Sequence, residues 1–253
     1  MMSPEAFSLG PLVVRWYSLA YVAGITLGWA IMRRTGRRFL AAAQIDDLVF
    51  ACTLGVILGG RLGYVLFYNL MFYLDNPLEI VKVWNGGMSF HGGFAGVCLA
   101  IVWFARTRKT SVLRLGDLVC SILPIGLFFG RLANYVNGEL GGRALASPVK
   151  TGSYTWFAHP TQLYEAALEG LLLLVVVGLC YHRYGRTRAG TTAGAFCVGY
   201  ALCRFAVEFW RLPDAQIGYL AWGWLTMGQV LTVPVFALGL ALIAWPRKEP
   251  QSR

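Results

Sequence analysis

Seven stretches of mostly apolar residues recur along the chain, each near the length that crosses a lipid bilayer. A helix needs about 20 apolar residues to cross about 30 Å of hydrocarbon. The stretches cover residues 12–31, 48–67, 90–105, 118–136, 163–181, 193–209 and 222–245. In hydrocarbon, backbone N–H and C=O groups must bond within their own segment, which favours helices. We therefore expect an all-α, polytopic integral membrane protein with about seven transmembrane helices.

The composition supports a membrane protein of one domain. Hydrophobic residues make up 57% of the chain and charged residues only 13%, whereas soluble domains carry about 25% charged residues. The longest polar connections, 69–89 and 137–161, are too short for a soluble domain, so we expect residues 1–253 to form a single integral membrane domain. The net charge of +10 does not predict nucleic acid as a partner, because so apolar a chain has no basic surface for phosphates.

Lysine and arginine are distributed unequally between the two sides of a seven-span topology. Fourteen lie in the connections on one side, and only Lys82, Arg143, Lys150 and Arg211 lie on the other. Positive residues are retained in the cytoplasm. The count predicts that the N-terminus is outside, on the periplasmic side, and that the C-terminus is cytoplasmic.

Four arginines lie within the apolar stretches: Arg15, Arg61, Arg131 and Arg204. An arginine at the centre of a span costs about 2.5 to 3.5 kcal/mol on insertion, so it usually marks function. The alternative is that an arginine near a helix end extends to the headgroups, which for Arg15 is as good an interpretation as function. In the expected topology all four lie on the outer side, against the positive-inside bias.

Further polar residues gather at the same outer side. His91, Glu139, Glu165 and Glu208 lie near the outer ends of their spans. Spacings of four, eight and eleven residues predict that one helix face carries Tyr200, Arg204, Glu208 and Arg211. A second polar stripe carries Gln162, Glu165 and Glu169.

Carboxylates that hold guanidiniums rigid, with some arginine charge in excess, predict a pocket for a lipid phosphate, which arginine binds in bidentate fashion. The competing interpretation is a closed ion-pair network that pins helices together, with Glu208 bound to Arg204 or Arg211. We favour the functional interpretation for the outer cluster as a whole. Two glycine-rich segments border it, residues 86–93 around His91 and residues 130–143. Glycines there would allow close backbone approach to a headgroup, although such a segment is more often a turn or a packing face.

Seven blocks, in order along nearly the whole chain, carry a family resemblance. They are VRWYSLAY (14–21), GGRLGYVLFYN (59–69), VWNGGMSFHGG (83–93), GRLANYVNGELGGR (130–143), HPTQLYE (159–165), RFAVEFWRLPDAQ (204–216) and MGQ (227–229). Together they resemble the prolipoprotein diacylglyceryl transferases. The resemblance implies a multi-pass enzyme of the bacterial inner membrane with its active site toward the periplasm. It also implies the reaction, which transfers the diacylglyceryl group of phosphatidylglycerol to the lipobox cysteine thiol of preprolipoproteins, giving a thioether and glycerol 1-phosphate.

The resemblance also assigns residue roles. It implies catalytic roles for His91, Arg131 and Arg204. The substrate-binding residues that it implies are Arg131, Asn134, Glu139, Gly142, Tyr17, Tyr200, Glu208 and Arg211. The partners would be phosphatidylglycerol, the lipobox segment and membrane lipids, with no metal and no cofactor.

The chemistry of the residues fits this assignment. A free thiol with a pKa of about 8.5 needs a base or a positive field to become a thiolate, and the departing phosphate needs preorganised cations. We expect Arg131 and Arg204 to hold the phosphate and His91 to receive or relay the thiol proton. The alternative function is an anionic-lipid or anion transporter that uses the outer arginines, although transporters usually place their site near the midplane.

Overall fold

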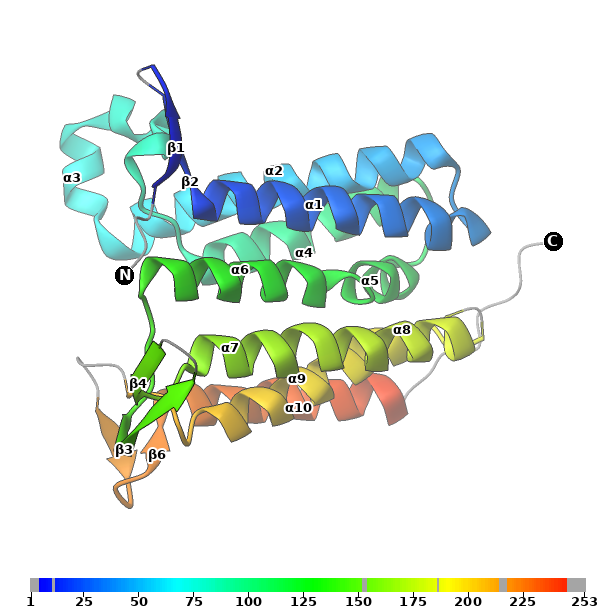
Figure 1. The fold of residues 1–253 in the computed structure, drawn as a ribbon. Helices are drawn as coiled ribbons and strands as arrows, with labels where there is room; N and C mark the ends of the chain where they lie inside the picture. The colour runs from blue at the N-terminus through cyan, green and yellow to red at the C-terminus, as the bar shows by residue number, and fades with distance from the viewer. Residues whose placement is uncertain (1–4, 11, 152–153, 186, 214–217, 245–253) are drawn as a thin grey trace. The chain divides into compact units, whose positions relative to one another are not determined.

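The structure is a computed structural model that describes residues 5–10, 12–151, 154–185, 187–213 and 218–244. It divides into two compact units (Figure 1). One comprises the described parts of residues 1–31 and 117–253, and the other comprises residues 32–116. We call them the site unit and the α2–α4 unit, and each is described by itself. The expectation of a single domain stays a prediction.

The α2–α4 unit is built on two helices that pack through glycines. Helix α2 (Ala42–Tyr68) packs on α4 (Phe90–Thr107). Between them come α3 (Leu70–Asp75) and the short 3-10 helices η2 (Pro77–Val81) and η3 (Val83–Asn85), while η1 (Gly36–Arg38) precedes α2. A Cβ on Gly92 or Gly96 would overlap the backbone of α2 at Gly59 or Gly55. Small residues at such contacts let helices approach closely in a membrane.

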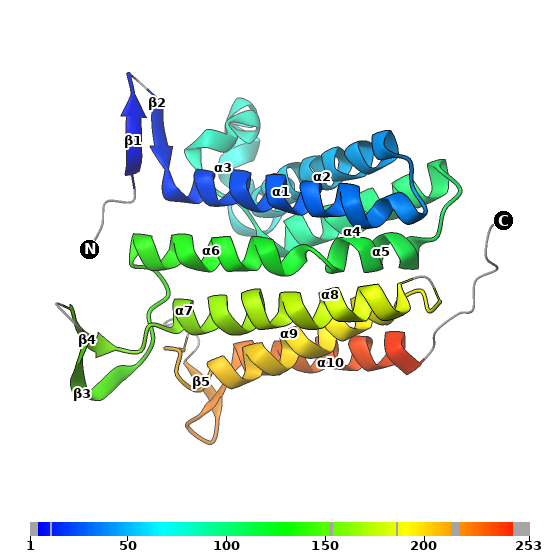
Figure 2. The same ribbon diagram turned by 45° about the vertical axis from the view of Figure 1, so that its right-hand side comes forward.

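The site unit is a set of helices that run side by side in both ribbon views (Figure 2). They are α6 (Leu123–Asn137), the continuous stretch of α7 (Thr161–Glu165), the π-helical η4 (Ala166–Leu172) and α8 (Leu173–Tyr184), then α9 (Thr191–Val207) and α10 (Met227–Ala244). Leu173, Val177 and Phe196 form a buried core between α8 and α9. Helices α1 (Trp16–Thr35) and α5 (Val112–Cys120) each cross from one unit into the other.

A buried carboxylate from α5 fixes the start of α9. Asp117 is 0% exposed, and its two oxygens accept hydrogen bonds of 2.7 Å from the backbone N–H groups of Gly190 and Ala193. A helix start leaves backbone N–H groups without helical partners and carries partial positive charge, so an anion there is stabilising. Asp117 therefore does from a neighbouring helix what a capping residue normally does from its own.

Three short hairpins accompany the helices, one before α1 and two in connections between helices. They pair β1 (Glu5–Leu9) with β2 (Leu12–Arg15), β3 (Ala144–Thr151) with β4 (Tyr154–Ala158), and β5 (Tyr219–Ala221) with β6 (Leu225–Thr226), all antiparallel. The expected spans 12–31 and 222–245 therefore begin too early, because residues 12–15 and 225–226 are strands and the helices start at Trp16 and Met227. Arg15 consequently lies on β2 opposite Glu5, not inside a helix.

The membrane-spanning character agrees with the sequence. Five described helical stretches are long and apolar enough to cross a membrane: 42–68, 90–107, 112–137, 161–184 and 227–244. Helix α9 is apolar but shorter. The chain is therefore a mostly helical, polytopic membrane protein, as expected, and the count of seven spans stays a prediction.

The glycine contact between α2 and α4 gives a prediction for stability. We expect Gly96→Ala to lower the free energy of unfolding by about 1 to 3 kcal/mol, because the new methyl group overlaps the Gly55 carbonyl. The control is Gly116→Ala on α5, where a Cβ meets no atom within 4 Å. Thermal unfolding in detergent measures both variants, and equal stability of the two would contradict the close packing.

A buried arginine–glutamate network

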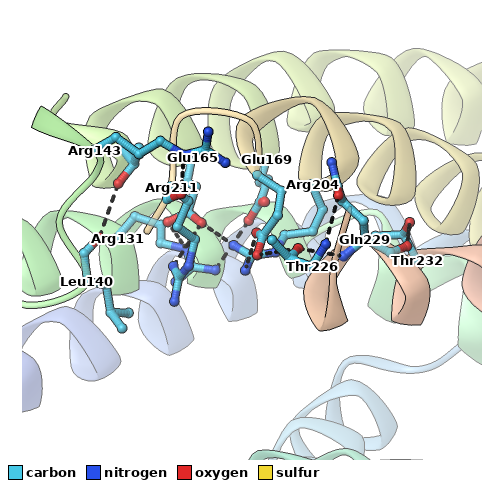
Figure 3. A network of polar contacts seen from close by, with 12 residues as sticks. Arg131, Leu140, Arg143, Glu165, Glu169, Arg204, Arg211, Thr226, Gln229 and Thr232 are labelled. Carbon is cyan, nitrogen blue, oxygen red and sulfur yellow. Dashed lines mark hydrogen bonds and ion pairs between the residues drawn. The ribbon is translucent and has the colours of Figure 1, made fainter. Parts of the chain in front are cut away.

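Glu165 is the central group of a polar network within the site unit (Figure 3). The side chain is 0% exposed and contacts three guanidiniums. Arg131 Nε lies 3.2 Å from Oε2, Arg211 Nη1 lies 3.3 Å from Oε1, and Arg204 Nη1 also binds Oε1. One buried carboxylate therefore ties together α6, α9 and the segment that follows α9.

Two further carboxylates complete the network. Glu169, also 0% exposed, contacts Arg131 Nη2 at 3.4 Å, and Glu208 contacts Arg204 Nη2 at 2.9 Å. Glu169 lies on the π-helical segment η4, a helix type that is frequent at functional sites. Glu208 also accepts a hydrogen bond of 3.0 Å from Thr226, beside the buried Gln229 at the start of α10.

Exposure differs sharply between the anions and the cations of the network. The Glu165 and Glu169 side chains are sealed from solvent, whereas those of Arg131, Arg204 and Arg211 are 18%, 14% and 11% exposed. The carboxylates thus bind the guanidiniums on their buried side. Part of each guanidinium-bearing side chain remains exposed at the surface of the unit. An anion arriving from outside would meet the arginines and not the glutamates.

The charges of this network differ from the expected arginine excess. Three arginines face three glutamates, so the formal charges balance within the group. A fourth guanidinium, that of Arg143, donates from Nε to the Arg211 carbonyl at 3.2 Å and lies 5.4 Å from the Tyr219 ring. Among the described residues, its buried Nη2 has no hydrogen-bond partner. Arg143 therefore adds a positive charge beside the network, although the sequence placed it only among the outer basic residues.

A second cluster joins Tyr17, Asn134 and Glu139. Asn134 Nδ2 donates to Glu139 Oε2 at 3.1 Å and also to the Tyr17 hydroxyl, which lies 3.5 Å from the same carboxylate oxygen. Gly138, with φ 72°, ends α6 in the left-handed conformation and turns Glu139 back toward Asn134. The three predicted residues are therefore close together.

Gly142 lies where three segments cross. Its N–H donates to the His159 carbonyl at 3.0 Å, and it pairs with Arg211 as an isolated β-bridge. A Cβ at Gly142 would lie 2.5 Å from the His159 carbonyl oxygen and 2.7 Å from that of Trp210. Only glycine fits, so Gly142 brings the 130–143 segment against the segment that carries Arg211.

Two other predicted residues have different surroundings. Tyr200 stacks on Phe196, with 5.9 Å between ring centroids, and packs on the hydrophobic core. His91 lies in the α2–α4 unit at the start of α4, where it is exposed. The expected single face from Tyr200 to Arg211 is wrong in its last member, because α9 ends at Val207 and Arg211 lies beyond it.

Sequence analysis missed the central role of Glu165. Glu165 was placed on a polar stripe with Gln162 and Glu169, in a cluster whose carboxylates were expected to hold guanidiniums rigid, but neither glutamate was named as a site residue. The sequence does contain a signal for this role: two glutamates four residues apart lie within an apolar span. A carboxylate buried there needs a cation as its partner. Thr226 and Gln229 carried no such signal. For metal ions, the described residues contain no cluster of three or more His, Cys, Asp or Glu that could hold one.

The fold and the network define a multi-pass membrane protein with an arginine-lined polar site at the ends of its helices. The model of the prolipoprotein diacylglyceryl transferase family matches residues 4–245. This chain belongs to that family.

Individual relatives agree along the whole chain. The phosphatidylglycerol–prolipoprotein diacylglyceryl transferase of Paramagnetospirillum magneticum is 50% identical over 252 residues, which cover 96% of this chain and 93% of the relative. Proteins of the same name from Rhizobium meliloti and Azospirillum brasilense are each 49% identical, over 97% and 98% of this chain and 92% and 96% of their own lengths.

The shared carboxylate gives a second prediction. Glu165→Gln leaves three buried guanidiniums facing two carboxylates, and we expect it to lower the free energy of unfolding by about 3 kcal/mol or more. The matched control is Asp47→Asn, which removes a carboxylate bound to Arg108 at the surface and should cost about 1 kcal/mol or less. Thermal unfolding in detergent compares the two. A Glu165→Gln protein as stable as the control would show that the network contributes little.

Proposed function

We propose that this chain transfers the diacylglyceryl group of phosphatidylglycerol to the thiol of the lipobox cysteine of preprolipoproteins. The products are a thioether and glycerol 1-phosphate. Family membership and the names of the relatives support this reaction. The structural observation that supports it best is the set of arginines held from behind by buried glutamates.

The arginines supply what a phosphodiester headgroup requires. Arg131 and Arg204 share Glu165, so their guanidiniums are fixed before a ligand arrives. Preorganised donors stabilise developing charge without reorganising during the reaction. The exposed part of each guanidinium binds the phosphate, and Arg143 with its unpartnered Nη2 adds positive charge beside it.

The reaction is a displacement at the glycerol carbon that carries the phosphate ester. The thiolate sulfur forms the new C–S bond while the C–O bond to phosphate breaks, and the electron pair leaves with the phosphate oxygen. Arg131 and Arg204 stabilise that oxygen as charge develops on it. His91 takes the thiol proton, either directly or through a relay.

The remaining predicted residues position the substrates. Glu208 and Arg211 hold the arginine network in place, and Gly142 fixes the segment crossing beside it. Tyr17, Asn134 and Glu139 form a polar cluster that offers hydroxyl, amide and carboxylate groups to the glycerol headgroup. Tyr200 supports the network from the hydrophobic core.

The location follows from the charge distribution. We assign seven spans, with the N-terminus and the site on the periplasmic side of the bacterial inner membrane and the C-terminus in the cytoplasm. Fourteen lysines and arginines in the connections of one side, against four on the other, support this orientation. The substrates are then a lipid of the same membrane and a peptide that reaches its outer surface.

The deciding experiment is transfer from labelled phosphatidylglycerol to a lipobox peptide in detergent. We expect a thioether product with the wild type and a loss of about 100-fold or more with Arg131→Ala, because one phosphate donor is removed. The control is Arg108→Ala, which removes an exposed arginine paired with Asp47 and should retain transfer. No transfer by the wild type would disprove the proposed function, and normal transfer by Arg131→Ala would disprove the phosphate site.

The role of His91 has its own prediction. His91→Gln should lower kcat by about 100-fold at neutral pH, because glutamine cannot accept the thiol proton. Raising the pH should partly restore the rate, since the thiol then ionises without help. A variant with near-normal turnover at neutral pH would remove the proton-transfer role from His91.

A further inference from the structure

Arg61 is one of two arginines, with Arg15, whose role the sequence left open. Its side chain lies in the α2–α4 unit, on α2, and the residue is only 4% exposed. Its guanidinium points into the segment between α3 and α4 and contacts only backbone carbonyls and one aromatic ring among the contacts of the described residues.

All five N–H groups of Arg61 have acceptors. Nε donates to the Ile80 carbonyl at 2.9 Å, and Nη2 donates to the carbonyls of Glu79 at 2.6 Å and Lys82 at 3.2 Å. Nη1 donates to the Gly87 carbonyl at 3.1 Å and also to that of Gly86. A guanidinium has five donors in a fixed fork, so none remains for a phosphate.

The five acceptors differ in what else they bind. The Glu79 and Lys82 carbonyls also accept from the backbone N–H groups of Lys82 and Asn85, whereas Arg61 is the donor that the described residues offer to the carbonyls of Ile80, Gly86 and Gly87. Gly86 and Gly87 have φ of 83° and 78°, a left-handed conformation that makes no regular ladder. The Tyr73 ring, 5.1 Å from the guanidinium carbon, covers the cation.

Several large apolar side chains in and beside this segment point outward, although Ile80 is half-buried and Gly87 lies against the Tyr64 ring of α2. Met71, Leu78, Val81 and Trp84 are between 68% and 79% exposed. Glu79, Lys82 and Asn85 bind one another at the surface, and the hydrogen bond from Lys82 lowers the pKa of the Glu79 carboxyl. The five hydrogen bonds of Arg61 therefore attach residues 79–87 to α2 where few large apolar side chains are buried.

The same segment leads directly into the start of α4. Ser89 donates its N–H to the Gly60 carbonyl at 2.8 Å, next to Arg61 on α2, and its hydroxyl accepts from Gly92 N–H at 3.2 Å as the N-cap of α4. His91 is the second residue of that helix. Arg61 and Gly60 thus bind the chain immediately before His91, Arg61 at residues 79–87 and Gly60 at Ser89.

We propose that Arg61 is a positioning residue, which fastens residues 79–87 to α2 through five backbone carbonyls and so sets the place of His91. It is not a ligand of the phosphate. The part that concerns catalysis rests on the proposed function, since it takes His91 as the residue that handles the thiol proton. The attachment of residues 79–87 to α2 by Arg61 does not depend on the proposed function.

Arg61→Lys tests the proposal, because lysine keeps the charge but has three donors on one atom in place of the planar fork. Hydrogen exchange in detergent should accelerate at least tenfold at the amides of residues 79–89. In the transfer assay, kcat should fall at least tenfold while KM for phosphatidylglycerol stays within twofold of the wild type. The matched control is Glu79→Gln, which replaces a half-buried carboxylate of the same segment by an amide of the same shape, keeps the backbone carbonyl that Arg61 binds, and should leave both measurements near wild type.

The outcomes separate the alternatives. A raised KM with unchanged kcat would make Arg61 a phosphate ligand, and unchanged hydrogen exchange would show that it does not fasten the segment; either result overturns the proposal. If Arg61→Lys does not fold, Gly86→Ala displaces one acceptor carbonyl by disfavouring its positive φ and should give the same changes to a smaller degree. Failure of the wild type to transfer would count against the proposed function alone, because hydrogen exchange still tests the fastening.

Discussion

The arrangement of the site unit depends on one carboxylate that three guanidiniums share. Glu165 has no contact with solvent, and a buried charge of this kind is tolerated only where cations and hydrogen bonds compensate its lost hydration. Those cations come from α6, from α9 and from the segment after α9. The carboxylate therefore fixes the mutual position of the groups proposed to bind phosphate, and it does so from a side that solvent and ligand do not reach.

Much of this could be predicted from the sequence. The apolar stretches indicated the helices, and arginines inside them marked Arg131 and Arg204 as unusual, since both residues are costly in hydrocarbon without partners. The contacts of Glu165 bring these two arginines together, and Tyr17, Asn134 and Glu139 also lie close to one another. The length of a helix and the free-energy cost of a charge within it depend on a local segment, so both can be predicted from the sequence.

Which residues contact one another in the site could not be predicted, because these contacts depend on where distant chain segments cross. Arg211 was expected to continue the face of α9, but the helix ends at Val207 and the residue reaches Glu165 on another helix. The crossing at Gly142 depends on carbonyls of His159 and Trp210, which no spacing relates to it. The contacts of Arg61 could not be predicted either. Its acceptors are backbone carbonyls, and because every residue has one, the sequence does not mark which of them it binds.

Helix α9 is bound near both of its ends by carboxylates that belong to other helices. Asp117 holds the backbone at its start, and Glu165 holds Arg204 in its last turn. Sliding α9 along its axis by one helical turn, about 5.4 Å, would separate both pairs at once, so that Asp117 would lose both of its donors and Glu165 one of its three guanidiniums. Shear of this helix would therefore be costly, and the two carboxylates keep the partly exposed guanidinium of Arg204 at a fixed height along the helix axis.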